Sequence, residues 1–363
     1  MARSQLVLLG LLICLQVPVF PQQGAPAPQS QSPALKLRSE AKPQEGRIHL
    51  DVVVTDKKGQ PVSGLELKDF TLLDNKQPPK IASFHAIDSN VERADPPAEV
   101  ILLLDAVNLT YLELARTRDG AAKFLRENDG HLAAPVSVAL FTDDGMKRLI
   151  EPSMDGNALA TQLDQAKATF RTIGRSAGEL GASERFNLSI KGLVMVAESE
   201  AQNPRRKLLV WLSPGWPMMN RANTKTSPQG VRLLFDHAVD ISTTLREAHV
   251  VVYSVSVAGE MGDNILTADF YENYLKGVSD PDKIDSDNLN LKVIAVQSGG
   301  LAMSPDNDLA AQIRTCVQDE GAFYTLSFDP PKTDRVDEYH DLKVIIDRPK
   351  VTARTSTGYY NQP

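Results

Sequence analysis

The spacing of apolar residues changes along the chain, and the longest stretch of one kind covers residues 98–320. Here short aliphatic runs alternate with segments in which apolar residues recur every three or four positions. The runs lie at residues 100–104, 136–141, 207–212 and 250–257, and the helical segments at 112–127, 157–169, 190–197, 231–245 and 289–297. Continuous apolar runs are typical of strands buried on both faces, and intervening helices connect such strands in parallel. The pattern therefore predicts an α/β domain with a doubly wound, mostly parallel sheet.

Apolar and polar residues alternate with a period of two on both sides of this domain. Residues 47–90 predict strands at 48–54, 70–73 and 81–84, and residues 321–363 predict strands at 323–328, 342–346 and 351–355. Neither segment is large enough to be stable alone. We expect the C-terminal strands to pair with the N-terminal ones in one accessory antiparallel β-sandwich, with two separate small β units as the alternative.

The N-terminus predicts export from the cytoplasm. Arg3 precedes about ten apolar residues, a run typical of a signal peptide and too short to span a bilayer. We assign residues 1–25 to a cleaved signal peptide and residues 26–46, rich in Pro and Gln, to a disordered linker. The expected location is secreted or periplasmic, and a lipoprotein anchored at Cys14 is the alternative. No later run is long enough to predict a transmembrane segment.

Composition narrows the functional classes. The net charge is −7, and no basic surface is apparent, so we expect no nucleic-acid partner. Removal of the signal peptide leaves Cys316 as the single cysteine, which excludes an internal disulfide. Cys316 shares a helical face with Leu309 and Ile313, which predicts a buried apolar role rather than a reactive thiol.

Candidate binding residues follow the ends of two predicted strands. Asp105 ends the aliphatic run at 100–104, and Asn108 and Thr110 follow it, while Ser213 and Trp216 follow the run at 207–212. Ligands bind beside the carboxyl ends of parallel strands, and a buried carboxylate there needs a metal, solvent or hydrogen bonds. We therefore predict a binding rim. It comprises residues 105–110, 172–182 and 213–220.

Several segments resemble the secreted bacterial VWFA-related branch of the von Willebrand factor A superfamily, of the type abundant in acidobacteria. The matching segments are 52–62 with 69–73, 100–105, 206–215, 298–300, 323–331 and 357–360. The resemblance covers most of residues 47–360. It implies a von Willebrand A-type α/β fold and a role in protein interaction.

The resemblance also implies a metal-ion-dependent adhesion site, but this chain departs from that pattern. Such a site takes Asp-x-Ser-x-Ser from one loop, a threonine from a second and an aspartate from a third, all hard oxygen ligands for Mg²⁺ or Mn²⁺. Asp105 matches, whereas Val107 and Leu109 replace the serines and Pro214 replaces the second aspartate. Candidates for the threonine are Thr172, Ser176 and Ser183. We expect a degenerate site without metal or other cofactor.

The expected function is a non-enzymatic protein-interaction module whose partner the sequence does not identify. One alternative is a Mg²⁺- or Mn²⁺-dependent adhesion domain with a non-standard site formed by Asp105, Asn108 and Ser213. Another is a secreted hydrolase, but the sequence has neither a His-Glu-x-x-His pair nor a Gly-x-Ser-x-Gly elbow. Residues 141–145 read like the missing metal loop, but they follow the wrong strand and predict a hairpin turn.

Overall fold

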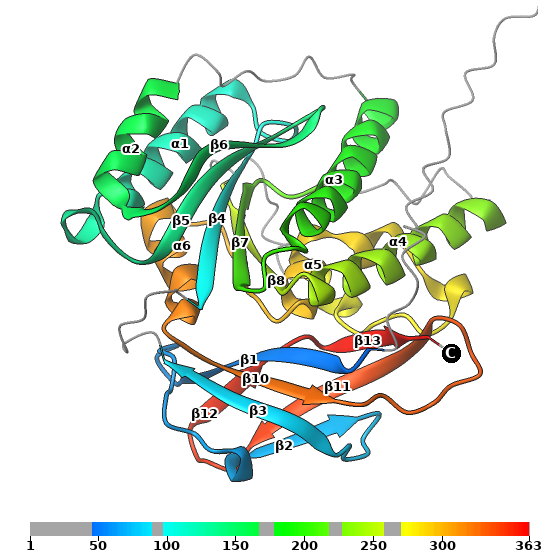
Figure 1. The fold of residues 1–363 in the computed structure, drawn as a ribbon. Helices are drawn as coiled ribbons and strands as arrows, with labels where there is room; N and C mark the ends of the chain where they lie inside the picture. Colours follow the sequence, from blue (N-terminus) through cyan, green and yellow to red (C-terminus); the bar gives the residue numbers. More distant parts are fainter. Residues whose placement is uncertain (1–45, 89–96, 167–177, 218–226, 258–269, 363) are drawn as a thin grey trace, which may run out of the picture. The chain divides into compact units, whose positions relative to one another are not determined.

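A six-stranded sheet with the order β6-β5-β4-β7-β8-β9 forms the centre of the α/β domain (Figure 1). Its strands are β4 (Ala98–Asp105), β5 (His131–Thr142), β6 (Gly145–Asp155), β7 (Arg206–Ser213), β8 (Val250–Ser256) and β9 (Ala302–Met303). All neighbours pair in parallel except β5 and β6, which form an antiparallel hairpin. The strand order reverses between β4 and β7, which places the topological switch point of the sheet there. The predicted doubly wound, mostly parallel sheet is therefore confirmed.

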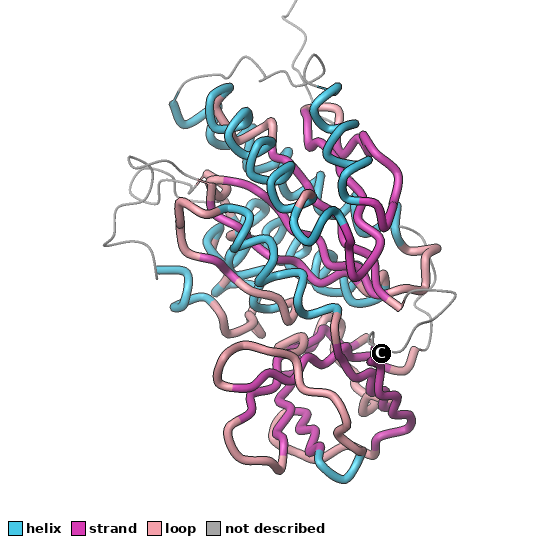
Figure 2. The backbone as a smooth tube through the Cα atoms, turned by 90° about the vertical axis from the view of Figure 1, so that its left-hand side faces the viewer, coloured by secondary structure: helices cyan, strands magenta, loops and turns pink. Residues whose placement is uncertain are grey.

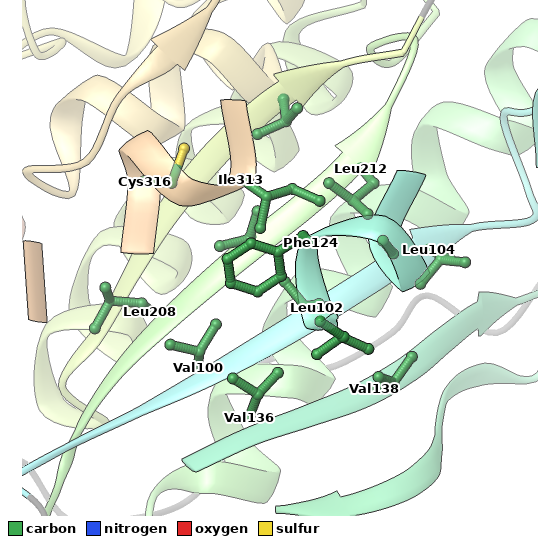
Figure 3. Packing of buried hydrophobic residues seen from close by; sticks show 14 of the residues in the cluster. Val100, Leu102, Leu104, Phe124, Val136, Val138, Leu208, Leu212, Ile313 and Cys316 are labelled. Atoms are coloured by element: carbon green, nitrogen blue, oxygen red, sulfur yellow. The ribbon is translucent and has the colours of Figure 1, made fainter. Parts of the chain in front are cut away.

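Helices cover both faces of this sheet, as Figure 2 shows. They are α1 (Tyr111–Leu125), α2 (Gly156–Gln165), α3 (Gly178–Glu200), α4 (Pro228–Glu247), α5 (Leu291–Gln297) and α6 (Leu309–Val317). On one face α1 and α6 enclose a cluster that contains Val100, Leu102, Phe124 and Ile313 (Figure 3). Cys316 belongs to the same cluster and is fully buried, so its predicted apolar role is confirmed.

The accessory unit consists of two antiparallel sheets. Its strands are β1 (Ile48–Asp56), β2 (Phe70–Asp74), β3 (Ile81–Asp88), β10 (Ala322–Phe328), β11 (Glu338–Ile346), β12 (Val351–Arg354) and β13 (Gly358–Asn361). One sheet has the order β12-β1-β10-β3 and the other the order β13-β11-β2. Each sheet combines strands from both ends of the chain, and side chains of both sheets share one apolar core. The predicted sandwich is confirmed, and the alternative of two separate β units is wrong.

Three strands, β6, β9 and β13, differ from the sequence prediction. The segment 141–145 does form the turn of a hairpin, but its second strand, β6, was not predicted. This strand is polar and lies at the edge of the sheet, where Pro152 needs no ladder hydrogen bond. β9, a strand of two residues, and β13, a strand of four residues, were also missed.

The computed structural model describes residues 46–88, 97–166, 178–217, 227–257 and 270–362, which belong to one compact unit. The predicted signal peptide and all but the last residue of the predicted linker lie outside these residues. Within the described part of the chain, no helix has the length and apolar character that crossing a membrane requires.

Candidate functional site

Asp105 lies at the carboxyl end of β4, next to the end of β7 at the switch point of the sheet. Side chains alternate between the two faces of a strand, so Asp105 shares a face with Leu103. Leu103 pairs with Trp211 of β7, which places Trp211 and Ser213 on that face too. The sequence prediction for the position of Asp105 is therefore correct, and the strand register explains its neighbours.

Within the described residues, five hydrogen bonds converge on the Asp105 carboxylate. Oδ1 accepts from the backbone N–H groups of Val107, at 3.1 Å, and Asn108, at 2.9 Å. Oδ2 accepts from Asn108 Nδ2 at 2.9 Å, Trp211 Nε1 at 3.1 Å and Ser213 Oγ at 2.7 Å. A carboxylate offers about four lone-pair positions, so these five donors occupy the positions at which it can accept hydrogen bonds.

The network extends from Asp105 to α3 and to the loop after β7. Asn108 Nδ2 also donates to Ser189 Oγ at 3.0 Å, and Ser189 Oγ donates to the carbonyl of Arg185 at 2.8 Å. Ser213 Oγ accepts from the backbone N–H of Gly215 at 3.1 Å. One carboxylate thus fixes the β4–α1 loop, the β7 loop and the middle of α3 relative to one another.

Burial dominates the electrostatics of the site. Asp105 is completely buried, and this burial raises the pKa of its carboxyl group, while the hydrogen bonds from Asn108, Ser213 and Trp211 lower that pKa again. Asn108 Oδ1 is buried as well, and it has no hydrogen-bond partner within the described part of the chain.

Mg²⁺ and Mn²⁺ require several oxygen ligands, whereas the described residues around Asp105 offer mainly hydrogen-bond donors. The carboxylate faces N–H donors instead, and an indole N–H such as that of Trp211 cannot bind a cation. Val107 and Leu109, which occupy the two serine positions of the adhesion site, are buried aliphatic side chains. Among the described residues, no group of three or more His, Cys, Asp or Glu side chains is placed to hold a metal ion.

Of the five predicted binding residues, Thr110 alone is exposed. It caps α1: its hydroxyl accepts from the N–H of Glu113 at 3.3 Å, and Glu113 Oε2 accepts from the N–H of Thr110 at 2.7 Å. Asp105, Asn108 and Ser213 are buried, so direct contact of their side chains with a partner does not fit the structure.

Trp216 was predicted as a binding residue of the rim, and the structure contradicts that role. Its side chain is only 4% exposed and packs edge-on against Trp211 with ring centroids 5.4 Å apart. Burial of its large apolar surface favours this position. Thr172, Ser176 and residues 218–220 of the predicted rim lie outside the described residues. Ser183 lies half-buried on α3.

Two members of the network around Asp105 were not predicted, Trp211 and Ser189. The sequence could have predicted Trp211, because side chains alternate between the two faces of a strand. Trp211 is two residues before Ser213 and therefore lies on the same face. The sequence contains no comparable signal for Ser189, which reaches the site through the packing of α3.

Large apolar side chains are exposed beside the buried network. Tyr111 is 69% exposed and Leu112 is 58% exposed, both in the first turn of α1, which follows the Asp105 loop directly. Leu180, in the first turn of α3, is 84% exposed. Leu180 precedes Ser189 by nine residues, so it projects about 13 Å beyond the network along the helix axis. Thr110, Tyr111, Leu112 and Leu180 are called the carboxyl-edge rim below.

Comparison with known proteins finds similarity in solved structures. No family model matches the chain, and no curated protein matches it. The human COPII-coat protein Sec24c has 9% identity and a TM-score of 0.29, with 77% of this chain and 46% of that chain covered. A conserved hypothetical protein, BatB from Bacteroides thetaiotaomicron, has 13% identity and a TM-score of 0.27, with coverages of 61% and 95%. The VWA domain of SpRpn10 has 10% identity and a TM-score of 0.23, with coverages of 46% and 92%.

The match spans less than half of the Sec24c chain. At such low scores these likenesses carry no inference about function, and the fold class given above follows from the strand order and pairing of this chain. Assignment to the acidobacterial VWFA-related branch stays a prediction from the sequence.

Proposed function

We propose that this protein is a non-enzymatic protein-interaction module of von Willebrand A type, which binds its partner through the carboxyl-edge rim. The observation that supports this proposal is the exposure of Tyr111, Leu112 and Leu180 at the edge of the sheet where ligands of such folds bind. Exposed aromatic and aliphatic side chains beside a rigid polar support are typical of binding surfaces.

In this proposal the buried network replaces the metal of an adhesion site. A metal ion would present an open coordination position to a carboxylate of the partner. Here the Asp105 carboxylate and its hydrogen-bond network instead fix the β4–α1 loop, the loop after β7 and α3 in place. Binding then depends on shape and apolar contact, and chelators leave it unchanged.

The location that we propose is secreted or periplasmic, which the basic and apolar N-terminal residues support. Recovery of a shortened mature chain in the periplasmic or culture fraction checks this location. A full-length chain confined to the cytoplasm would contradict it.

The rim is tested by placing a photo-crosslinking amino acid at Thr110 and irradiating the protein with periplasmic and culture fractions of its source. We expect a discrete crosslinked partner whose binding weakens roughly tenfold or more in the double variant Tyr111→Ser, Leu112→Ser. All three substituted positions are exposed, and loss of the capping hydroxyl of Thr110 costs only about 1 kcal/mol, so folding is retained.

The matched control is Val336→Ser, which changes an equally exposed apolar side chain in the accessory unit; Val336 is 59% exposed. This control should bind like the parent protein. A partner that crosslinks equally to all variants, or the lack of any rim-dependent partner, would overturn the proposed function.

A further inference from the structure

A pocket lies where the C-terminal half of α4 meets β1, α5 and the turn before β13. Its free volume is about 60 Å³. A single water needs roughly 10–15 Å³ by this measure, so the pocket has room for a ligand of a few non-hydrogen atoms. Every residue of its lining belongs to the described part of the chain.

The lining combines an apolar wall with one cationic group. Ile241, Leu245, Leu289, Ile294 and Tyr360 provide apolar surface, and Arg246 provides the cation. Ser242 and Arg246 are four residues apart on α4 and therefore lie on one face of the helix.

Arg246 lacks the partners that a buried guanidinium normally has. Only 12% of its side chain is exposed, and its Nε is buried without a hydrogen-bond partner among the described residues. The ion pair between its Nη2 and Glu247 Oε1 is 3.7 Å long, and Glu247 is largely exposed. Burial lowers the pKa of Arg246, because the charged guanidinium loses its hydration and gains few partners in the protein. A buried charge of this kind is costly unless a ligand pairs with it.

Several other polar groups of the lining already have hydrogen-bond partners within the fold. Ser298 Oγ accepts from the N–H of Val252 at 2.9 Å and donates to the carbonyl of Ala295. Gln297 Nε2 donates to the carbonyl of Leu275 at 3.3 Å. The carboxylate of Asp51 also lines the pocket and lies 3.4 Å from His249 Nδ1. Arg246 is the only lysine or arginine of the lining, and its buried Nε lacks a partner among the described residues, so it is the group that can pair with an anionic ligand.

We infer that this pocket binds a small carboxylic acid, whose carboxylate pairs with Arg246 and whose short aliphatic part lies against the apolar wall. A guanidinium can donate two parallel hydrogen bonds to a carboxylate, which gives both strength and orientation. The volume limits the buried part of the acid to roughly four to six non-hydrogen atoms. The inference is independent of the carboxyl-edge rim.

Titration of the full mature protein with acetate, propionate and butyrate tests the inference, with binding followed by calorimetry or by chemical shifts. We expect saturable binding that weakens roughly 10- to 100-fold in Arg246→Gln, because a hydrogen-bonded charge is lost. Propionamide, which has the same shape without the charge, should not bind. Arg335→Gln, at an 81% exposed arginine, is the matched control and should bind like the parent.

A second variant excludes an effect of misfolding. Ser242→Leu retains Arg246 and fills the pocket, so it should abolish binding while its melting temperature stays close to that of the parent. Removal of an uncompensated charge should leave Arg246→Gln at least as heat-stable as the parent without ligand. Equal affinity of propionate for parent and Arg246→Gln, no saturation with any acid, or tighter binding of inorganic phosphate than of all three acids would overturn the inference.

Discussion

Asp105 is held by groups that are close in space and distant in the chain. Trp211 lies 106 positions after it and Ser213 lies 108 positions after it, yet both donate to the same carboxylate oxygen. A buried acceptor of this kind is costly to remove, because each donor left behind loses its partner. The residue therefore contributes to the stability of the fold as well as to the shape of the rim.

Asp105→Ala should lower the free energy of unfolding by about 3 kcal/mol, since several buried donors become unsatisfied. Asp105→Asn should lie between Ala and the parent, because one oxygen acceptor is retained. Urea denaturation measures both, and Asp144→Asn, at an exposed turn position, is the control that should change little. A loss below about 1 kcal/mol in Asp105→Ala would show that the network is not structural.

The same pair of proteins tests the metal alternative. Mg²⁺ or Mn²⁺ should change the melting temperature of neither the parent nor Asp105→Ala, because N–H groups face the carboxylate. Saturable binding that is present in the parent and lost in the variant would restore an adhesion site with Asp105 as a ligand.

At the scale of single elements, the packing of α3 against the sheet decides whether the network can form. Gly192 lies on α3 over the ring of Phe141, and a Cβ built there would be 2.2 Å from Phe141 Cε2. Phe141 is itself buried and packs against Trp211 with ring centroids 5.3 Å apart. The absence of a side chain at Gly192 thus allows the helix to approach closely enough for Ser189 to reach Asn108.

Gly192→Ala should be destabilising by about 1–2 kcal/mol, although alanine is the better helix former by about 1 kcal/mol. Thermal unfolding measures this loss, and Asn187→Ala, at an exposed position of the same helix, should be neutral or slightly stabilising. Adding Phe141→Leu to Gly192→Ala should give a loss smaller than the sum of the two single losses. Strict additivity would contradict the close contact.

Sequence reasoning was most successful where local pattern decides the structure. Continuous apolar runs predicted β4, β5, β7 and β8, because a strand buried on both faces has few polar positions. It failed for β6, where the exposed edge permits Lys147, Arg148 and Pro152. It placed Asp105 correctly but assigned Trp216 to the binding rim, since the sequence does not show that the loop after β7 folds back onto Trp211.

At the scale of the whole molecule, apolar contacts and hydrogen bonds join the accessory unit to the α/β domain. Val53 of β1 and Phe323 of β10 belong to the main hydrophobic cluster of the α/β domain. Arg354 of β12 donates two hydrogen bonds to Asp319, of 2.7 and 2.8 Å, and the hydroxyl of Tyr253 in β8 donates to the same carboxylate at 2.7 Å. These contacts predict that both parts unfold together.

Arg354→Ala should lower the stability of both parts by about 3 kcal/mol, because it leaves the carboxylate of Asp319 buried without its cation. Differential scanning calorimetry should show one transition for the parent, at a lower temperature for the variant. Arg47→Ala removes an exposed ion pair with Asp329 in the same unit and should cost less than about 1 kcal/mol. Two separate transitions in the parent would contradict the coupling.

The pairing of β1 with β10 also determines when the protein can finish folding during its synthesis. Ile48 pairs with Phe328, 280 residues later. At about 5–20 residues per second, β1 waits roughly 15–55 s for its partner strand to leave the ribosome. During that time its valine-rich edge is available to chaperones and to other nascent chains. A chain that is translated in this order remains incompletely folded until nearly all of it has emerged.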